Sequence, residues 1–296
     1  MHAGYPQIQL TVSAATNKLN GYTFDDAGNV ITDADGRSFT YDAENKQVEV
    51  KDSVSSTIGT YYFDGDGKRV KKVVPSTGET TVFVYDAAGK QIAEYSTIVE
   101  PSSTAKVAYL TNDHLGSPRI NTDQNGAITA RHDYHPFGEE IVTSHRVAGL
   151  DYAADTIRKQ FTGYERDSET NLDFSVARYL SSTAGRWTSP DYFKNDTTIV
   201  APQSWNLYAF ARNNPLMFID RSGRDLYIEI GGKSYKVSQV GGAFVLRNED
   251  HSDSSVHSVQ NLLNEVGQSF RSSIHNLIQD RGDNTIRVKL PTILMR

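Results

Sequence analysis

A short unit that recurs four times in the first third of the chain limits what the chain can fold into. The unit is an aromatic residue, an aspartate, two further residues, a glycine or asparagine, a polar residue, one more residue and then Val or Ile. Its copies are FDDAGNVI (24–31), YDAENKQV (41–48), FDGDGKRV (63–70) and YDAAGKQI (85–92), and TDQNGAI around Asp123 and Gly126 is a degenerate fifth copy. An aspartate side chain bonds back to nearby backbone, and glycine or asparagine tolerates positive φ, so each unit predicts a tight turn between two strands.

The segments between these turns have the pattern of strands. Residues 69–74, RVKKVV, and 81–85, TVFVY, are rich in β-branched and aromatic residues, and apolar and polar positions alternate. The chain also contains 16 tyrosines and 22 glycines, which suit pleated surfaces and tight turns. The first hundred residues are therefore predicted to be stacked hairpins, each of which buries one face on its neighbours.

Composition excludes several classes of function. A net charge of -6 with 22% charged residues over 296 positions lacks the basic footprint of a nucleic-acid-binding protein, so no nucleic-acid partner is expected. The absence of cysteine excludes disulfides, thiol catalysis and cysteine-ligated zinc. No apolar run approaches the length of a membrane span, and the first residues, MHAGYPQIQLTV, lack the basic and apolar regions of a signal peptide.

Four further blocks follow the repeats. They are YLTNDHLGSPR (109–119), YHPFG (134–138), FTGYERDSETNLDFSVARYLSSTAGRWTSP (161–190) and NLYAFARNNPLMFID (206–220). In this order, and together with the repeated unit, they resemble the YD repeats and the repeat-associated core of bacterial Rhs proteins and eukaryotic teneurins. The resemblance covers residues 20 to about 223. It implies a mainly β fold in which YD-repeat hairpins form a curved sheet or partial shell, plugged by the Rhs core segment and followed by a small α+β tail.

The same resemblance divides the chain into YD-repeat hairpins (1–105), a repeat-associated core (106–224) and a variable C-terminal module (225–296). It implies a structural, encapsulating module that carries a polymorphic C-terminal domain in bacterial competition or surface interaction. The partner would be the chain's own tail, and the location would be secreted or at the cell surface. The hairpins are too few to enclose a folded toxin, so we expect a fragment of a longer protein, an orphan module or a miniature member of the family.

Two alternatives to this function remain open. One is an aspartic autoprotease that releases the tail near residue 223. The other is a self-assembling fibre or tube protein, because unpaired strand edges invite self-association.

The autoprotease alternative names particular residues. The family's cut uses two carboxylates that share one proton, so that one acts as acid while the other activates water. The matching positions are Asp191 and Asp220, with Arg186 as the supporting arginine and Gly223 and Arg224 as the cleavage region. In this chain neither aspartate is followed by proline, and the leucine that the family has at the cut is missing. Both aspartates are therefore also interpreted as turn residues of a structural plug.

The tail has a different pattern. Segments 225–230, 233–240 and 243–247, separated by Gly-Gly pairs, predict a three-stranded meander. Apolar residues three or four apart between 256 and 277 predict one helix, and residues 285–290, TIRVKL, predict a last strand. Its histidines and glutamates have no spacing typical of a catalytic or metal site; they are Glu249, His251, His257, Glu265 and His275.

No cofactor and no metal are expected. DADG (33–36) and DGDG (64–67) lack the ligand pattern of a calcium-binding EF-hand loop and are interpreted as hairpin turns. His132 and His135, three apart on a strand, would point to opposite faces. Asp113–His114 has no serine nucleophile in a suitable turn and is assigned to turn packing.

Overall fold

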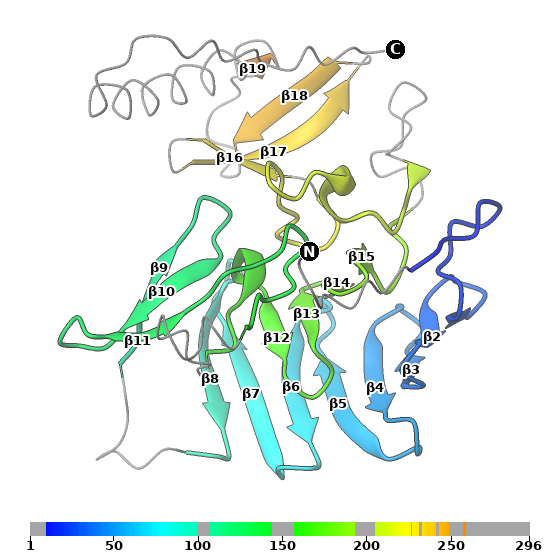
Figure 1. The fold of residues 1–296 in the computed structure, drawn as a ribbon, viewed down its shortest axis with the longest axis horizontal. Coiled ribbons are helices and arrows are strands. Elements are labelled where there is room, and N and C mark those ends of the chain that lie inside the picture. The colour runs from blue at the N-terminus through cyan, green and yellow to red at the C-terminus, as the bar shows by residue number, and fades with distance from the viewer. Residues whose placement is uncertain are drawn as a thin grey trace. The chain divides into compact units, whose positions relative to one another are not determined.

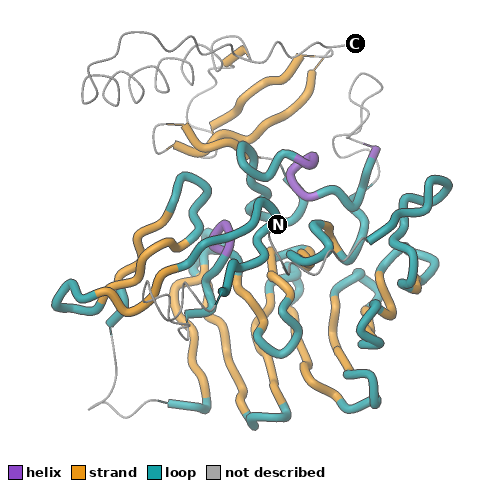
Figure 2. The backbone as a smooth tube through the Cα atoms, in the orientation of Figure 1, coloured by secondary structure: helices purple, strands orange, loops and turns teal. Residues whose placement is uncertain are grey.

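The structure is a computed structural model that describes residues 10–99, 107–143, 157–192 and 205–225, and the strands between residues 227 and 258. The chain divides into two compact units, Met1–Lys236 and Val237–Arg296. Strands make up most of the regular structure in the described residues (Figure 2), which confirms the mainly β prediction. No helix among these residues is long and apolar enough to cross a membrane.

Eight antiparallel strands form a single meander in the first unit, and each strand pairs with the next one along the chain (Figure 1). The strands are β1 (Thr23–Phe24), β2 (Val30–Thr32), β3 (Ser38–Tyr41), β4 (Gln47–Lys51), β5 (Thr57–Phe63), β6 (Arg69–Val74), β7 (Glu79–Tyr85) and β8 (Gln91–Ser96). The predicted stack of hairpins is confirmed.

One recurring set of hydrogen bonds makes the aspartate turns. The backbone N–H of Asp64 donates to the carbonyl of Lys68 at 2.9 Å, and its carboxylate Oδ1 accepts the N–H groups of Asp66 and Lys68 at 3.0 and 2.8 Å. Gly67 donates to the Asp64 carbonyl from a φ of +76°, where other residues are strained. The same bond from an aspartate N–H to the carbonyl four residues on recurs at Asp25, Asp33, Asp42, Asp52, Asp86, Asp113 and Asp123. The turn is therefore more frequent than the repeat alone indicates.

One face of the eight-stranded sheet, the inner face, packs against the rest of the unit. Tyr61 on β5 lies opposite Lys72 on β6, and Lys72 lies opposite Thr81 on β7. Phe39 and Val50 form a pair in the same way on β3 and β4. All five side chains are buried. The inner face is therefore apolar over β3 and β4 but carries a positive charge at β6.

Two smaller sheets complete the first unit as far as residue 225. The three-stranded sheet consists of β9 (Tyr109–Asn112), β10 (Pro118–Thr122) and β11 (Ile128–Arg131). The four-stranded sheet consists of β12 (Glu165–Asp167), β13 (Leu172–Ser175), β14 (Arg178–Ser181) and β15 (Arg186–Trp187). Two short 3-10 helices, η1 (Phe161–Gly163) and η3 (Phe210–Asn213), precede and follow the four-stranded sheet in sequence.

We call residues 157–192 and 205–225 the plug, because they cover the inner face. Leu172, Phe174 and Tyr179 of β13 and β14 belong to the same buried apolar cluster as Phe39 and Val50. Figure 1 shows β12 and β13 lying across the strands of the large sheet. The core segment thus plugs the curved sheet as the family resemblance implies.

The chain continues from the plug into β16 (Tyr227–Ile230). Ile219 and Tyr227 exchange backbone hydrogen bonds of 3.0 and 2.7 Å. β16 then pairs with β17 (Lys233–Val240), where Tyr227 lies opposite Lys236. The three strands predicted for residues 225–247 are present as β16, β17 and β18 (Ala243–Asn248). The division into two compact units falls within β17.

In the second unit, the residues at the start of the predicted helix form a strand instead. His257 and Ser258 form β19, which pairs with β18 through Leu246 opposite His257 and Val245 opposite Ser258. A helix from residue 256 is therefore wrong for these two residues, because cross-strand pairing outweighs the local periodicity. The rest of that helix, the strand at 285–290 and the remaining tail histidines and glutamates lie outside the described residues.

Candidate functional site

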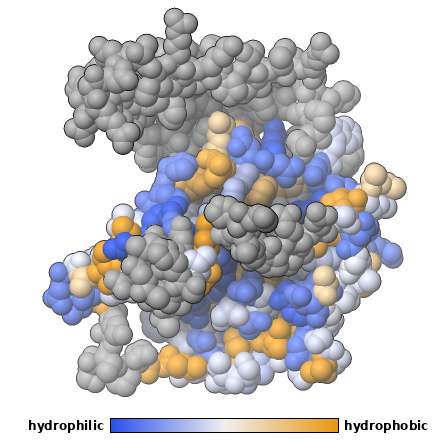
Figure 3. All heavy atoms as spheres, in the orientation of Figure 1, coloured by the Kyte–Doolittle hydropathy of each residue, from blue (hydrophilic) through white to orange (hydrophobic). Residues whose placement is uncertain are grey.

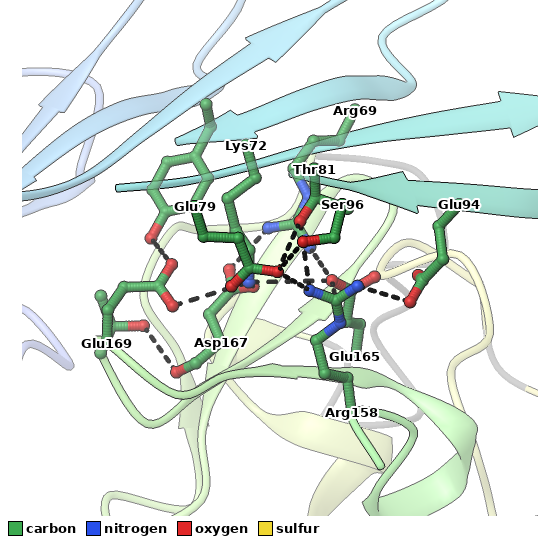
Figure 4. Close-up of polar contacts among 12 residues, drawn as sticks. Arg69, Lys72, Glu79, Thr81, Glu94, Ser96, Arg158, Glu165, Asp167 and Glu169 are labelled. Carbon is green, nitrogen blue, oxygen red and sulfur yellow. Dashed lines mark hydrogen bonds and ion pairs between the residues drawn. The ribbon is translucent and has the colours of Figure 1, made fainter. Parts of the chain in front are cut away.

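Five buried charged side chains join the plug to the sheet, and we call them the β6–β12 cluster (Figure 4). Arg69 and Lys72 come from the inner face of β6, Glu165 and Asp167 from β12, and Glu169 from the turn that follows. Each of these side chains is at most 3% exposed. Arg69 and Asp167 are 98 residues apart in sequence, so the cluster forms only when the plug is docked.

Asp167 is the centre of the cluster. Its Oδ2 lies 2.6 Å from Nη1 of Arg69, and its Oδ1 lies 2.9 Å from Nζ of Lys72. Nη2 of Arg69 lies 2.9 Å from Oε1 of Glu165, while Nζ of Lys72 lies 3.6 Å from Oε2 of Glu169. Removing one partner from such a buried network leaves a charge without compensation, which costs about 3–5 kcal/mol.

Aromatic rings enclose the Arg69 guanidinium. Its central carbon lies 4.1 Å from the ring centroid of Phe174 on the plug, and 5.1 and 5.4 Å from the rings of Phe83 and Tyr61 on the sheet. Desolvated contacts between a cation and an aromatic ring contribute up to about 2 kcal/mol. The guanidinium is therefore held between sheet and plug by both ion pairs and rings.

Arg158 extends the network to the next two strands. Its Nη1 lies 3.3 Å from Oε1 of Glu79 on β7, and its Nη2 pairs with Glu94 on β8. Its Nε lies 3.9 Å from Glu165. Burial alone would raise the pKa of Glu79, but the hydrogen bond from Ser96 and the charge of Arg158 lower it. Plug and sheet are thus linked by charge across β6, β7 and β8.

The carboxyl groups of the cluster have opposite pKa shifts. Burial alone would raise the pKa of Asp167, but Arg69 and Lys72 hold it below its ordinary value. Burial raises the pKa of Glu169, and the negative charge of Asp167 raises it further. Burial also raises the pKa of Tyr61 well above its ordinary value, so its hydroxyl stays neutral and donates to Oε1 of Glu169 at 2.8 Å.

At a second site, the two aspartates that the autoprotease alternative names, Asp191 and Asp220, both lie beside one arginine, Arg178. Nη2 of Arg178, on β14, lies 2.9 Å from Oδ2 of Asp191 and 3.3 Å from Oδ2 of Asp220. Nη1 of Arg178 donates to the carbonyl of Leu207 at 3.1 Å, and its Nε donates to the carbonyl of Gly223. One buried side chain therefore binds four separate points of the plug.

Asp220 lies in a buried turn, and most of the oxygen atoms of this residue accept hydrogen bonds there. Its Oδ1 accepts the backbone N–H groups of Arg224 and Asp225 at 2.8 and 2.9 Å, and its carbonyl accepts the hydroxyl of Tyr164. Burial raises the pKa of Asp220 to about 6, although Arg178 and the backbone bonds oppose the rise. This carboxyl can take up a proton just below neutral pH, yet its hydrogen bonds are those of a turn residue.

The predicted cleavage region is tightly held. Gly223 has a φ of +73°, and a Cβ there would lie 2.6 Å from the carbonyl oxygen of Ser175 and 3.1 Å from the backbone nitrogen of Arg178. The Arg224 guanidinium lies 4.2 Å from the ring centroid of Tyr192 and donates to its hydroxyl at 2.9 Å. The peptide between residues 223 and 224 is therefore anchored on both sides.

The arginine that contacts both aspartates is Arg178 rather than the predicted Arg186. Nη2 of Arg186 donates to the carbonyl of Asn17 at 2.9 Å and to Oδ1 of Asn206 at 3.1 Å, so Arg186 binds an N-terminal loop to the plug. The prediction relied on the GRW motif. The signal for Arg178 is an arginine inside the apolar strand VARYL, because a buried arginine requires acidic or carbonyl partners.

A cavity of about 140 Å³ opens beside Asp191 and Arg178. Its lining includes Asn29, Glu44, Asp191, Tyr192 and Arg224. Both signs of charge and several hydrogen-bonding groups face it, and its volume accommodates a few ordered waters.

The remaining candidates have packing roles. Among the residues that the structure describes, no group of three or more histidines, aspartates or glutamates could hold a metal ion. The buried His132 has its Nδ1 2.7 Å from Glu140 and its Nε2 3.1 Å from Asn121. Nε2 of His114 lies 3.1 Å from the carbonyl oxygen of Leu216.

Comparison with known proteins gives a consistent result. Residues 10–216 match the sequence model of the family described as Teneurin YD-shell. The tRNA3(Ser)-specific nuclease WapA of Bacillus spizizenii is 27% identical in an alignment of 248 positions that covers 74% of this chain and 10% of the nuclease. Teneurin-1 of Gallus gallus is 27% identical over 207 residues, which is 69% of this chain and 7% of the teneurin. The chain thus spans a tenth or less of the length of these relatives.

Solved structures share the fold. The crystal structure of TcdB2-TccC3-Cdc42 matches with a TM-score of 0.54 at 21% identity, over 73% of this chain and 12% of that chain. The Photorhabdus luminescens Tc holotoxin pore matches with a TM-score of 0.52 at 21% identity, over 72% of this chain and 12% of that chain.

Proposed function

The chain belongs to the Teneurin YD-shell family, and from that membership we propose that it is a structural, encapsulating module that carries the residues after 225 as a polymorphic C-terminal domain. We place this role in bacterial competition or in interaction at the cell surface, with the protein secreted or surface-located. The proposal is supported by relatives named as tRNA nucleases and by structural neighbours from Tc toxin assemblies.

One observation carries the proposal: the chain is bound firmly at the point where it leaves the plug. Arg178 binds the carboxylate of Asp220 and the carbonyl of Gly223, and Asp220 binds the next two backbone N–H groups. A module that carries a variable domain needs a fixed exit, because the plug must keep its packing whatever sequence follows. The buried turn at residues 220–225 has this property.

The carrier role predicts that the chain stays in one piece. Both carboxylates bind Arg178, and Asp220 also accepts the hydrogen bonds of its turn, which supports structural roles over the shared-proton pair that the autoprotease alternative requires. Intact mass spectrometry of freshly purified protein should show one dominant species of 32.8 kDa. A stoichiometric pair of fragments split at 220–225, absent from Asp220→Asn, would favour the autoprotease alternative.

The competition role has its own test. Residues 226–296 and the full chain are expressed separately in bacteria under the same inducible promoter, and growth is compared at equal protein levels. We expect the separate tail to slow growth and the full chain to slow it less. A tail with no effect alone, or with the same effect in both forms, would contradict the competition role.

A further inference from the structure

The β6–β12 cluster contains more acids than bases. Three carboxyl groups face two cations, and every member is at most 3% exposed. Arg158 does not restore the balance, since it also pairs with Glu79 and Glu94. An unpaired buried charge is costly, and buried groups avoid that cost by changing protonation.

We propose that the plug docks on the sheet together with one proton, held on Glu169, so that the strength of docking depends on pH. This inference concerns the joint between plug and sheet and does not depend on what the residues after 225 do. If the docked plug binds one more proton than the undocked plug does, the pH of the solution changes the stability of docking.

Geometry selects Glu169 among the three acids. Asp167 has a cation at 2.6 Å and another at 2.9 Å, and Glu165 has Arg69 at 2.9 Å. Glu169 has one cation among the described residues, Lys72 at 3.6 Å, and its Oε1 accepts the neutral hydroxyl of Tyr61. Its Oε2, like Oε1 of Glu165, is buried and accepts no hydrogen bond from any residue that the structure describes, so the longer distance to its cation is what distinguishes Glu169 from Glu165. A neutral carboxylic acid fits this position better than a carboxylate does.

The surrounding groups leave this assignment intact. The charged and titratable side chains that face the cluster are Tyr61 on β5, Arg69 and Lys72 on β6, Glu79 and Tyr85 on β7, Glu94 on β8, Arg158 before β12, and Tyr179 on β14. Burial raises the pKa of all three tyrosines, which stay neutral. Arg166 and Asp173, also on this hairpin, pair with each other at 2.8 Å.

The sign of the pH dependence follows from the two shifts. Burial, and then the charge of Asp167, raise the pKa of Glu169 above its ordinary value in the docked state. The stability that Glu169 contributes is therefore present at low pH and is lost as the pH rises through this raised pKa. The pKa of Asp167 is lowered, so its contribution is lost only in stronger acid. Docking should be strongest in mildly acidic surroundings.

Glu169→Gln tests the proposal, because glutamine has the shape and neutrality of the protonated acid. Trp187 is buried in the plug at 2% exposure, so its fluorescence reports thermal undocking between pH 5 and pH 8. We expect Glu169→Gln to melt with the wild type at pH 5 and about 3–5 °C above it at pH 8, which corresponds to a roughly tenfold change in equilibrium. The matched control Glu94→Gln, at an exposed ion pair of the same network, should give no gain at pH 8.

Each other result overturns the proposal. A Glu169→Gln protein that fails to fold, melts below the wild type at pH 8, or differs from it equally at every pH would show that Glu169 is docked as a carboxylate. Infrared difference spectroscopy provides a second measurement on the wild type. The carbonyl band of protonated carboxyls should grow as the pH is lowered, and part of that growth should be missing from the Glu169→Gln spectrum; an identical band in both proteins would contradict the assignment to Glu169.

Discussion

Arg69 and Arg178 are buried arginines on strands, and each lies between carboxylates and an aromatic ring. Arg69 uses two terminal nitrogens for two different acids, and Arg178 uses all three guanidinium nitrogens. A lysine has one ammonium group and cannot reproduce this fork. At both positions the planar group fixes the relative placement of segments far apart in sequence.

Gly223 gives a test at the scale of one residue. Gly223→Ala would place a Cβ 2.6 Å from the Ser175 carbonyl at a φ of +73°, so we expect a loss of about 2–4 kcal/mol in the free energy of unfolding. Gly126→Ala is the control, because it has a φ of +80° with nothing within 4 Å and should lose only about 1–2 kcal/mol. If urea denaturation gives the same loss in the free energy of unfolding for both variants, the close approach at Gly223 does not contribute to stability.

The turns are the elements that the sequence predicts best, because their cause is local. The aspartate, the glycine three residues later and the backbone between them provide the groups that form the turn. This turn places the two adjacent strands side by side, so that they pair. The plug is different. Lys72 and Asp167 are 95 residues apart, and nothing near either residue indicates the other. Only the family resemblance placed the plug on the sheet, and it did not identify Arg178 or the β6–β12 cluster.

The hairpin between β5 and β6 tests the turn as an element. Asp64→Ala removes a carboxylate that accepts two backbone N–H bonds, and we expect it to cost about 1–2 kcal/mol. Asp66→Ala, in the same turn, removes a side chain that is 79% exposed and lies 3.6 Å from Lys68, and should change stability by at most about 0.5 kcal/mol. If both variants denature at the same urea concentration, the repeated aspartate does not stabilise its turn.

At the scale of the whole molecule, a meander leaves strand edges at its two ends. The described part of the chain gives β8 one partner, β7, and β8 exposes Ile92 and Tyr95 at 62% and 67%. Figure 3 shows hydrophobic residues scattered among hydrophilic ones on the described part of the visible face. An edge with few charges and no proline is open to another strand, so we propose that β8 mediates self-association.

Light scattering across a range of concentrations tests this proposal. We expect the average mass to rise with concentration in the wild type and to stay that of a monomer in Tyr95→Lys, because a lysine on an edge strand opposes pairing. Tyr62→Lys is the control, since Tyr62 is also exposed, at 44%, but lies on β5 inside the sheet. A wild type that remains monomeric at every concentration, or an equal effect of both variants, would exclude β8 as the edge that associates.

The two cations on β6 also have a consequence during synthesis. A ribosome that adds about 5–20 residues per second needs roughly 5–20 s to proceed from Arg69 to Asp167, which lie 98 residues apart. During that interval the eight-stranded sheet can form, since each strand pairs with its sequence neighbour, but its inner face has no cover. Charged residues that point inward keep such a face from joining another nascent sheet. Arg69 and Lys72 would thus first oppose aggregation of the nascent chain, and only later form the ion pairs that bind the plug.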